Sequence, residues 1–230
     1  MQELNERYKQ VKNLINKAAI RADRDPSDVK LIAVSKKQPV KKIKFLAEKG
    51  VKIFGESRVQ ELRDKRQEFV DNDIEWHFIG HLQRNKVKYL MRMDDCTMIH
   101  SLDSLRLARK IEKRACKNER KISVLVQVNI AGDKNKFGIK PEKTIEFLKN
   151  IKDFKHIDIK GLMTLVPYYD DSEKARAHFS RLRNLKNSTC EKGFELEELS
   201  MGMTNDFEVA IEEGATIVRV GRALFGSRKY

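Results

Sequence analysis

The 230-residue sequence is poor in the features that mark secreted and membrane proteins. It has three cysteines, Cys96, Cys116 and Cys190, an odd number at wide spacing. That pattern argues against a disulfide framework and a zinc knuckle, and favours a reducing compartment. No apolar run approaches the roughly 20 residues that cross a bilayer, and the N-terminus is too charged for a signal peptide. We therefore expect a cytoplasmic protein with no membrane partner.

Proline is scarce, and no stretch rich in glycine, serine or proline divides the chain. The four prolines stand where an element would start or stop, at Pro26, Pro39, Pro141 and Pro167. One domain spanning residues 1–230 is predicted, and this length is enough to bury a sizeable core.

Charge of one sign is in excess. The 48 lysines and arginines outnumber the 34 aspartates and glutamates, for a formal net charge of +14. Such a surface could attract nucleic acid. However, the basic residues are spread along the chain among acids, and no arm, block or RNA-binding signature concentrates them. Charge alone therefore favours a solvated surface over a nucleic-acid partner.

Eight short apolar segments alternate with amphipathic helical segments, after an N-terminal helix over residues 2–22. The strands are predicted within 29–36, 52–57, 75–80, 97–103, 122–129, 159–165, 196–204 and 216–226. Strands that are apolar on both faces indicate a parallel sheet covered by helices. No phosphate-binding glycine fingerprint follows the first strand. The α/β pattern thus favours a single (β/α)8 TIM-type barrel with an extra N-terminal helix over a doubly wound sheet.

Functional residues of such a barrel cluster at the C-terminal ends of its strands. Lys36 closes the first apolar strand, where the barrel would present it to the mouth. An amine desolvated there has a lowered pKa and can attack an aldehyde to form a Schiff base. The alternative is that Lys36 and Lys37 merely begin a solvated loop.

The loops after strands seven and eight are candidates for binding phosphate, as in many barrels. The segment SMGMT (200–204) has hydroxyls at both ends and leads into a helix, whose N-terminal amides attract an anion. The segment RVGR (219–222) adds two cations and a glycine. The alternative is that Gly202 and Gly221 only relieve crowding at turns.

Histidine spacing gives no metal site. His77 and His81 are four residues apart, but their segment is typical of a strand and turn, and no third ligand is near. The sequence also lacks the motifs of serine hydrolases, P-loop nucleotide-binding proteins and EF-hands.

Six ordered motifs carry a resemblance to a known family. They are AVSK (33–36), FGESRVQE (54–61), WHFIGHLQRNK (76–86), GLMTL (161–165), SMGMTND (200–206) and VRVGRALFG (218–226). The sequence resembles the pyridoxal 5′-phosphate (PLP) homeostasis protein family, also called the proline-synthetase-co-transcribed homologue family, from about residue 4 onwards. The resemblance implies a barrel similar to the N-terminal domain of alanine racemase.

The resemblance also implies a cofactor site. PLP would form a Schiff base with Lys36, its phosphate would lie at the SMGM segment and Gly221, and Arg219 would face the pyridine nitrogen. Ser57 stands where the family usually has asparagine, and Arg222 where a smaller residue is frequent. The expected cofactor-binding residues are Lys36, Ser57, Met163, Ser200, Met201, Gly202, Arg219, Gly221 and Arg222.

Weak catalysis is expected from the same residues. PLP is the best electron sink when its ring nitrogen is protonated, normally opposite an acid, and an arginine such as Arg219 disfavours that proton. Since the sequence ends at Tyr230, soon after the eighth strand, we expect no second domain to supply a base. We therefore predict no catalytic residues and no robust activity.

The predicted function is PLP binding in intracellular vitamin B6 and amino-acid homeostasis. The alternatives are a low-activity PLP-dependent amino-acid racemase and a basic RNA- or partner-binding protein. The expected partners are PLP itself and PLP-dependent apo-enzymes as acceptors, with the chain a monomer or weak dimer.

Overall fold

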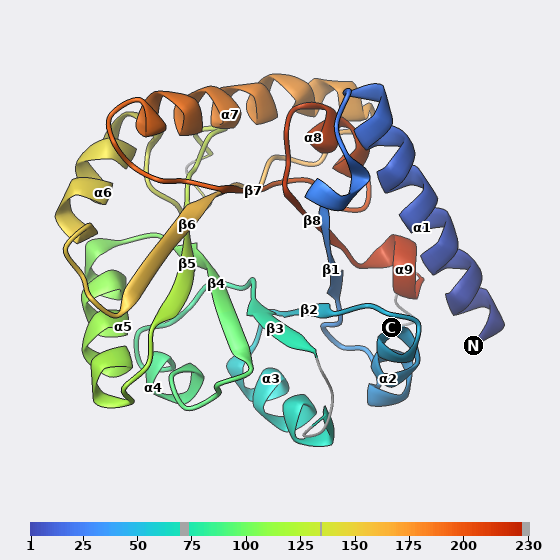
Figure 1. Cartoon of the computed structure of the whole chain (residues 1–230), viewed down its shortest axis with the longest axis horizontal. Coiled ribbons are helices and arrows are strands. Elements are labelled where there is room, and N and C mark those ends of the chain that lie inside the picture. Colours follow the sequence, from blue (N-terminus) through green and yellow to red (C-terminus); the bar gives the residue numbers. More distant parts are fainter. Residues whose placement is uncertain (70–73, 134, 227–230) are drawn as a thin grey trace.

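The computed structural model describes residues 1–69, 74–133 and 135–226, and contains a closed barrel of eight parallel strands (Figure 1). Each strand pairs with the next in the sequence, and β8 returns to β1. The strands are β1 (Lys30–Val34), β2 (Ile53–Glu56), β3 (Glu75–Phe78), β4 (Cys96–Leu102), β5 (Ile122–Gln127), β6 (Ile157–Met163), β7 (Glu198–Ser200) and β8 (Ile217–Val220). The predicted TIM-type barrel is confirmed.

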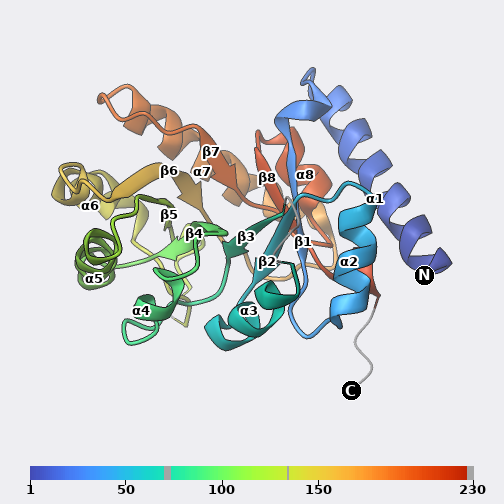
Figure 2. The same ribbon diagram turned by 60° about the horizontal axis from the view of Figure 1, so that its bottom comes forward.

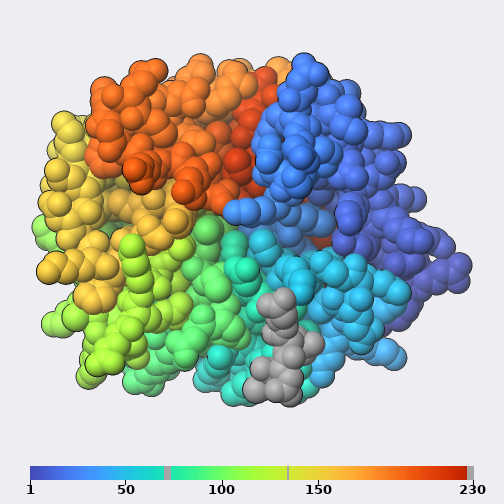
Figure 3. Space-filling view, in the orientation of Figure 1, coloured from blue at the N-terminus to red at the C-terminus, as the bar shows by residue number. Residues whose placement is uncertain are grey.

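Helices surround the strands and cover their outer faces (Figures 1 and 3). They are α1 (Gln2–Arg21), α2 (Val40–Glu48), α3 (Val59–Arg66), α4 (Val87–Leu90), α5 (Leu105–Lys117), α6 (Thr144–Ile151), α7 (Arg176–Cys190), α8 (Phe207–Glu212) and α9 (Arg222–Phe225). Short 3-10 helices lie at Pro26–Asp28, Gln67–Phe69, Pro141–Lys143 and Ser172–Ala175. No helix in the described ranges is both long and apolar enough to cross a membrane.

The predicted N-terminal helix is α1, which packs against α8 and α9 outside the ring (Figure 2). Its buried residues Leu4, Val11, Ile15 and Ala18 recur at helical spacing, as the sequence pattern predicts. At its C-terminal end Arg21 forms ion pairs of 3.0 and 2.8 Å with two glutamates of α8. The helix therefore covers the part of the barrel where the chain closes.

The end of the barrel differs from the sequence-based prediction. The sequence pattern predicts the eighth strand over residues 216–226, but β8 ends at Val220 and the short helix α9 begins at Arg222. An apolar run of this length has no periodicity that separates a strand from a helical turn. The bend at Gly221 places Arg222 on a different element from Arg219.

The apolar core has two layers. The larger lies between the strands and the helices, and the smaller fills the barrel. Because strand side chains alternate between faces, Ile32 and Val34 of β1 point inward, where they meet Leu125, Met163 and Ile217. The interior is thus packed with side chains below the mouth, and polar groups enter it only from particular strands.

Candidate functional site

Lys36 lies in the turn that follows β1, two positions after the inward-facing Val34. Its side chain is half-buried. The turn is closed by a 2.9 Å hydrogen bond from the Gln38 N–H to the Ser35 carbonyl, and Lys37 adopts a left-handed φ of 60°. A non-glycine residue in that conformation costs about 1 kcal/mol, so the surrounding contacts must hold the turn in place.

A buried polar cluster beneath this turn supplies those contacts. The Ser35 hydroxyl donates to Glu56 Oε1 at 2.7 Å. Lys65 Nζ lies 2.7 Å from Glu56 Oε1, from the Ser35 carbonyl and from Glu61 Oε1. The Lys37 N–H donates to the Glu61 carboxylate. The ends of β1 and β2 are thereby tied to α3, and the position of the Lys36 backbone is fixed.

Electrostatics within this cluster are balanced by pairing. Glu56 is fully buried, and burial raises the pKa of its carboxyl group while the charge of Lys65 opposes that rise. Lys65 is itself almost fully buried. Hydrogen bonds from Ser35 to Glu56 Oε1 and from Lys65 to Glu61 offset part of the desolvation of the pair, whereas buried Glu56 Oε2 has no hydrogen-bond partner among the described residues.

Arg219 is the buried cation of the barrel interior, on β8. One guanidinium nitrogen donates to the Ser200 hydroxyl, and another donates to the Thr164 carbonyl at 2.8 Å. Beyond Ser200, the His100 Nδ1 atom lies 3.0 Å from the hydroxyl oxygen, and His100 Nε2 lies 3.0 Å from His77 Nδ1. Strands β8, β7, β4 and β3 are thus linked across the barrel.

The direction of these hydrogen bonds follows from the two ends of the chain, because a guanidinium can only donate and a carboxylate can only accept. The Glu75 carboxylate lies 3.8 Å from His77 Nε2, so neutral His77 carries its proton on that nitrogen. His77 Nδ1 then accepts from His100 Nε2, and His100 Nδ1 accepts from the Ser200 hydroxyl, whose oxygen accepts from Arg219. Both imidazoles are neutral in this arrangement.

The pKa shifts agree with neutral histidines beside one buried charge. Burial lowers the pKa of His77, and burial, His77 and Arg219 together lower that of His100 well below its usual range. Burial also lowers the pKa of Arg219 to about 10, against the opposing charge of Asp206. Arg219 therefore remains protonated at neutral pH and carries the positive charge of this chain of hydrogen bonds.

The segment after β7 needs its glycine for packing. Gly202 has a φ of +89°, and a Cβ atom there would lie 2.6 Å from the Ala210 Cβ and 2.9 Å from the Phe207 Cα. The predicted turn role is therefore sufficient to explain Gly202. One amide of this segment is already used, since the Met203 N–H donates to Asp206 Oδ1 at 2.6 Å.

Gly221 is different, because neither backbone conformation nor packing requires it. Its φ of −118° suits any residue, and an added Cβ would make an ordinary contact of 3.4 Å with Val34. Nearby, exposed Arg222 donates to Asn205 Oδ1 at 3.3 Å, and the Thr204 hydroxyl accepts from the Ala223 N–H at 3.4 Å. The two loops predicted to hold a phosphate thus lie in contact.

The other predicted residues are placed as follows. Met163 belongs to the interior apolar cluster, and buried Met201 belongs to the outer core, where its N–H donates to the Ile217 carbonyl. Ser57 lies half-buried at the end of β2. Arg219 pairs with Ile32 in the register of β8 and β1, and Lys36 follows Ile32 by four residues, beyond the end of β1. The structure therefore brings Ser200 and Arg219 into contact, with Lys36 in the turn after the adjacent strand.

Sequence reasoning missed the residues that support this site. Lys65 and Glu61 lie on a strongly charged helix, which indicates a solvated face, and the partners of His100 come from distant strands. No cluster of three metal-ligating side chains occurs in the described part of the chain.

Comparison with known proteins gives consistent matches over nearly the whole chain. The alanine racemase N-terminal domain family matches residues 8–229. The pyridoxal phosphate homeostasis protein of Aquifex aeolicus is 46% identical over 226 residues, 98% of each chain. Its namesake in Mus musculus is 38% identical over 212 residues, 87% of this chain and 77% of the mouse protein.

Solved structures agree with these matches. The chain superposes with a TM-score of 0.82 on PipY of Synechococcus elongatus with PLP bound, at 34% identity, covering 92% of this chain and 100% of PipY. A protein of unknown function from Bifidobacterium adolescentis gives 0.90 at 33% identity, covering 97% and 95%. An alanine racemase of Clostridium difficile gives 0.79 at 18% identity and shares the fold, with 58% of its length covered.

Proposed function

The chain belongs to the pyridoxal phosphate homeostasis protein family, and from that premise we propose that it binds PLP at the barrel mouth, through a Schiff base on Lys36. The observation that carries this proposal is the position of Lys36 in the turn after β1, the strand that pairs with the strand of Arg219, with the loops after β7 and β8 in contact with each other. The polar cluster under the turn would keep the amine at one place while the cofactor binds and leaves.

The residues present fit a phosphate at the contact of the two loops. Gly221 has no side chain, so a phosphate could approach its backbone closely, although packing does not require a glycine there. Arg222 offers a cation beside it. Backbone N–H groups and guanidinium groups both bind phosphate oxygens well. Gly202 and Met201 would shape the same loop, and the Ser200 hydroxyl, already engaged by Arg219, would contribute mainly through that partner.

Arg219 would set the chemistry of the ring. PLP supplies an aldehyde for an amine and, with its ring nitrogen protonated, an electron sink. A buried guanidinium near that nitrogen disfavours the proton, because two positive charges in a low dielectric repel. The chain would hold the cofactor without driving amino-acid chemistry, in keeping with the homeostatic name of its relatives. We propose cytoplasmic PLP-dependent apo-enzymes as acceptors, with the chain a monomer or weak dimer.

Borohydride reduction followed by peptide mapping tests the attachment point. The purified protein should be yellow, and reduction should fix a pyridoxyl group on Lys36. Lys36→Ala should lose the absorption band and the label completely, whereas Lys37→Ala, which changes the exposed neighbour, should retain both. A pyridoxyl group on Lys37, or an unchanged band in Lys36→Ala, would contradict the assignment.

Turnover measurements test the carrier role against that of a low-activity racemase. We expect no rapid conversion of any proteinogenic amino acid. A turnover number near the enzyme median of about 10 per second would favour the enzyme.

A further inference from the structure

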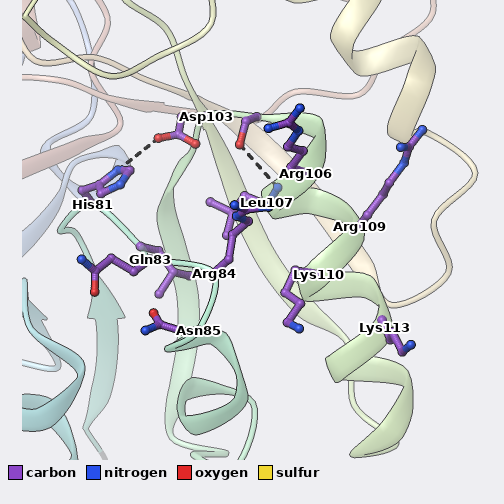
Figure 4. Close-up of a pocket in the computed structure, with 12 residues that line it drawn as sticks. His81, Gln83, Arg84, Asn85, Asp103, Arg106, Leu107, Arg109, Lys110 and Lys113 are labelled. Atoms are coloured by element: carbon purple, nitrogen blue, oxygen red, sulfur yellow. Dashed lines mark hydrogen bonds and ion pairs between the residues drawn. The ribbon is translucent and has the colours of Figure 1, made fainter.

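A groove separate from the proposed cofactor residues lies between the segment after β3 and the first turns of α5 (Figure 4). Its volume is about 1000 Å³. Figure 4 shows residues 83–85 on one side of it and the side chains of α5 on the other. The residues that line it are His81, Leu82, Gln83, Arg84, Asn85, Asp103, Ser104, Arg106, Leu107, Arg109, Lys110 and Lys113. We call it the basic groove.

Five cations of the basic groove have no acidic partner among the residues that the structure describes. No ion pair or hydrogen bond joins their side chains to any residue in the described ranges, although the chain has 34 acidic residues. The one carboxylate in the described lining, Asp103, is 3.2 Å from His81 Nδ1. The groove therefore presents a concentrated positive charge, contributed by Arg84, Arg106, Arg109, Lys110 and Lys113.

The spacing of these cations forms a stripe. Arg106 and Lys113 each lie three or four residues from both Arg109 and Lys110, so the four cations lie along one side of α5 over about 10 Å. Arg84 adds a guanidinium from the other wall. Arginine forks bind phosphate oxygens bidentately and lysines bind them as point charges, so the stripe suits a ligand that carries several phosphates in succession.

An exposed aromatic pair adjoins the basic groove through His81, which lines it. The rings of His81 and Phe137 stack with centroids 3.7 Å apart and planes 13° from parallel. Phe137 is 55% exposed, and a 2.9 Å hydrogen bond from Gln127 Nε2 to its carbonyl fixes its backbone. A fixed, exposed ring beside a row of cations is the arrangement on which unpaired bases stack.

The composition of the lining favours nucleic acid over an acidic protein. Protein interfaces have an apolar centre and are depleted in lysine, but Leu82 and Leu107 are buried at 2% and 1% exposure and the groove carries two lysines. Gln83 and Asn85 are exposed, and side-chain amides are typical readers of base edges. We propose that the basic groove binds single-stranded nucleic acid, with phosphates along α5 and a base on Phe137.

The salt dependence of binding measures the phosphate contacts. Fluorescence anisotropy with labelled 20-nucleotide single strands, one RNA and one DNA, gives affinity at several salt concentrations. Each neutralised phosphate contributes a slope of about −0.7 for single strands, so five cations predict about −3.5. The triple variant Arg106→Gln, Arg109→Gln and Lys113→Gln should reduce the magnitude of that slope by about 2.

A matched control removes the same charge elsewhere. Lys9, Lys12 and Lys17 are exposed on α1, which lies against α8 and α9. The triple variant Lys9→Gln, Lys12→Gln and Lys17→Gln should keep the slope of the parent protein. An equal loss in both triple variants would show diffuse attraction to the net charge and would overturn the proposal.

The aromatic contact has its own test. Phe137→Ala should weaken single-strand binding about tenfold with the salt slope unchanged, because base stacking and not charge is lost. Phe137→Tyr should bind the single strand as the parent protein does, because it keeps an aromatic ring. A duplex of the same sequence should bind more weakly than the single strand; equal affinity for the duplex, or no effect of Phe137→Ala, would overturn the stacking contact.

An acidic protein partner gives a distinct result. If the α5 triple variant loses binding to polyglutamate while the parent protein shows no affinity for either single strand, the groove is a protein-docking surface and the proposal is wrong. The cofactor absorption band should be the same in all these variants, since none of the substituted residues belongs to the proposed cofactor site, and its retention verifies folding.

Discussion

The polar residues under the barrel mouth and those of the basic groove are organised in opposite ways. Lys65 and Arg219 are buried, and each makes two or more hydrogen bonds to groups on other elements. Four of the groove's five cations are exposed, Lys110 is half-buried, and none pairs with a residue in the described ranges. Burial explains the first arrangement, because an unpaired buried charge costs several kcal/mol. Exposed cations carry no such cost and need no partner within the protein. Their concentration in one groove therefore points to a ligand.

Breaking a buried pair should give the largest effect on stability. Lys65→Met leaves the Glu56 carboxylate buried without its cation, and should lower the free energy of unfolding by about 3–5 kcal/mol. Urea denaturation measures the change. The exposed pair of Lys44 and Glu68, 3.3 Å apart, is the control, and Lys44→Met should cost less than about 1 kcal/mol.

A double variant sharpens this contrast. Glu56→Gln combined with Lys65→Met should recover part of the loss, because the stranded charge is removed as well. Equal costs for Lys65→Met and Lys44→Met would show that burial does not separate the two regions.

Comparing PLP with pyridoxal tests whether the loops at Gly221 and Gly202, like the groove, have groups that are free to bind an anion. Pyridoxal lacks the phosphate but keeps the aldehyde. Each charge-assisted hydrogen bond is worth roughly 1.5–3 kcal/mol, so two of them predict at least about a hundredfold tighter binding of PLP. Spectroscopic titration of both ligands gives the ratio.

Variants of the barrel mouth show which residues cause the difference in affinity between PLP and pyridoxal. Gly221→Val should weaken PLP more than pyridoxal, because it fills space at the proposed phosphate position. Gly193→Ala is a control at the turn after α7: its φ of +87° means that the substitution should cost some stability, but it should leave both affinities unchanged. Similar affinities of the parent protein for PLP and pyridoxal would place the phosphate elsewhere.

The buried histidines should give the smallest effect, through pH. Burial depresses the pKa values of His77 and His100, so the unfolded chain takes up protons that the folded chain refuses. Their contribution is complete above the unfolded pKa near 6.5 and is lost as pH falls, by about 1 kcal/mol per histidine between pH 6.5 and 5.5. His100→Gln should make unfolding less dependent on pH in this window; an unchanged dependence would contradict neutral, buried imidazoles.

The sequence was sufficient for the architecture because each strand is marked by its own local pattern. Eight apolar segments separated by helical spacing require no knowledge of long-range contacts. Lys36, Arg219 and Gly221 could be named because they stand at strand ends, where barrels place their chemistry. The boundary between β8 and α9 could not be found, since both belong to one apolar run.

The supporting residues and the basic groove depend on contacts between segments far apart in the sequence. Lys65 stands among charged residues, as an exposed lysine would, and it is buried because α3 packs on β1 and β2. The four groove cations of α5 belong to a helix whose one acidic residue is Glu112, and Arg84 joins them from a separate segment. The fold brings these two basic segments together, which their spacing along the chain does not show.

The one-way order of hydrogen bonds from Arg219 to His77 has a consequence for how such a barrel changes over evolution. An acid at position 219 accepts where arginine donates, so Ser200 would turn its hydrogen toward the acid and both imidazoles would move their protons to Nδ1. His77 would then present a lone pair to Glu75, and acceptor would face acceptor. A single substitution at position 219 is thus felt on the opposite side of the barrel. The charge at position 219 and the proton positions of His100 and His77 therefore change together.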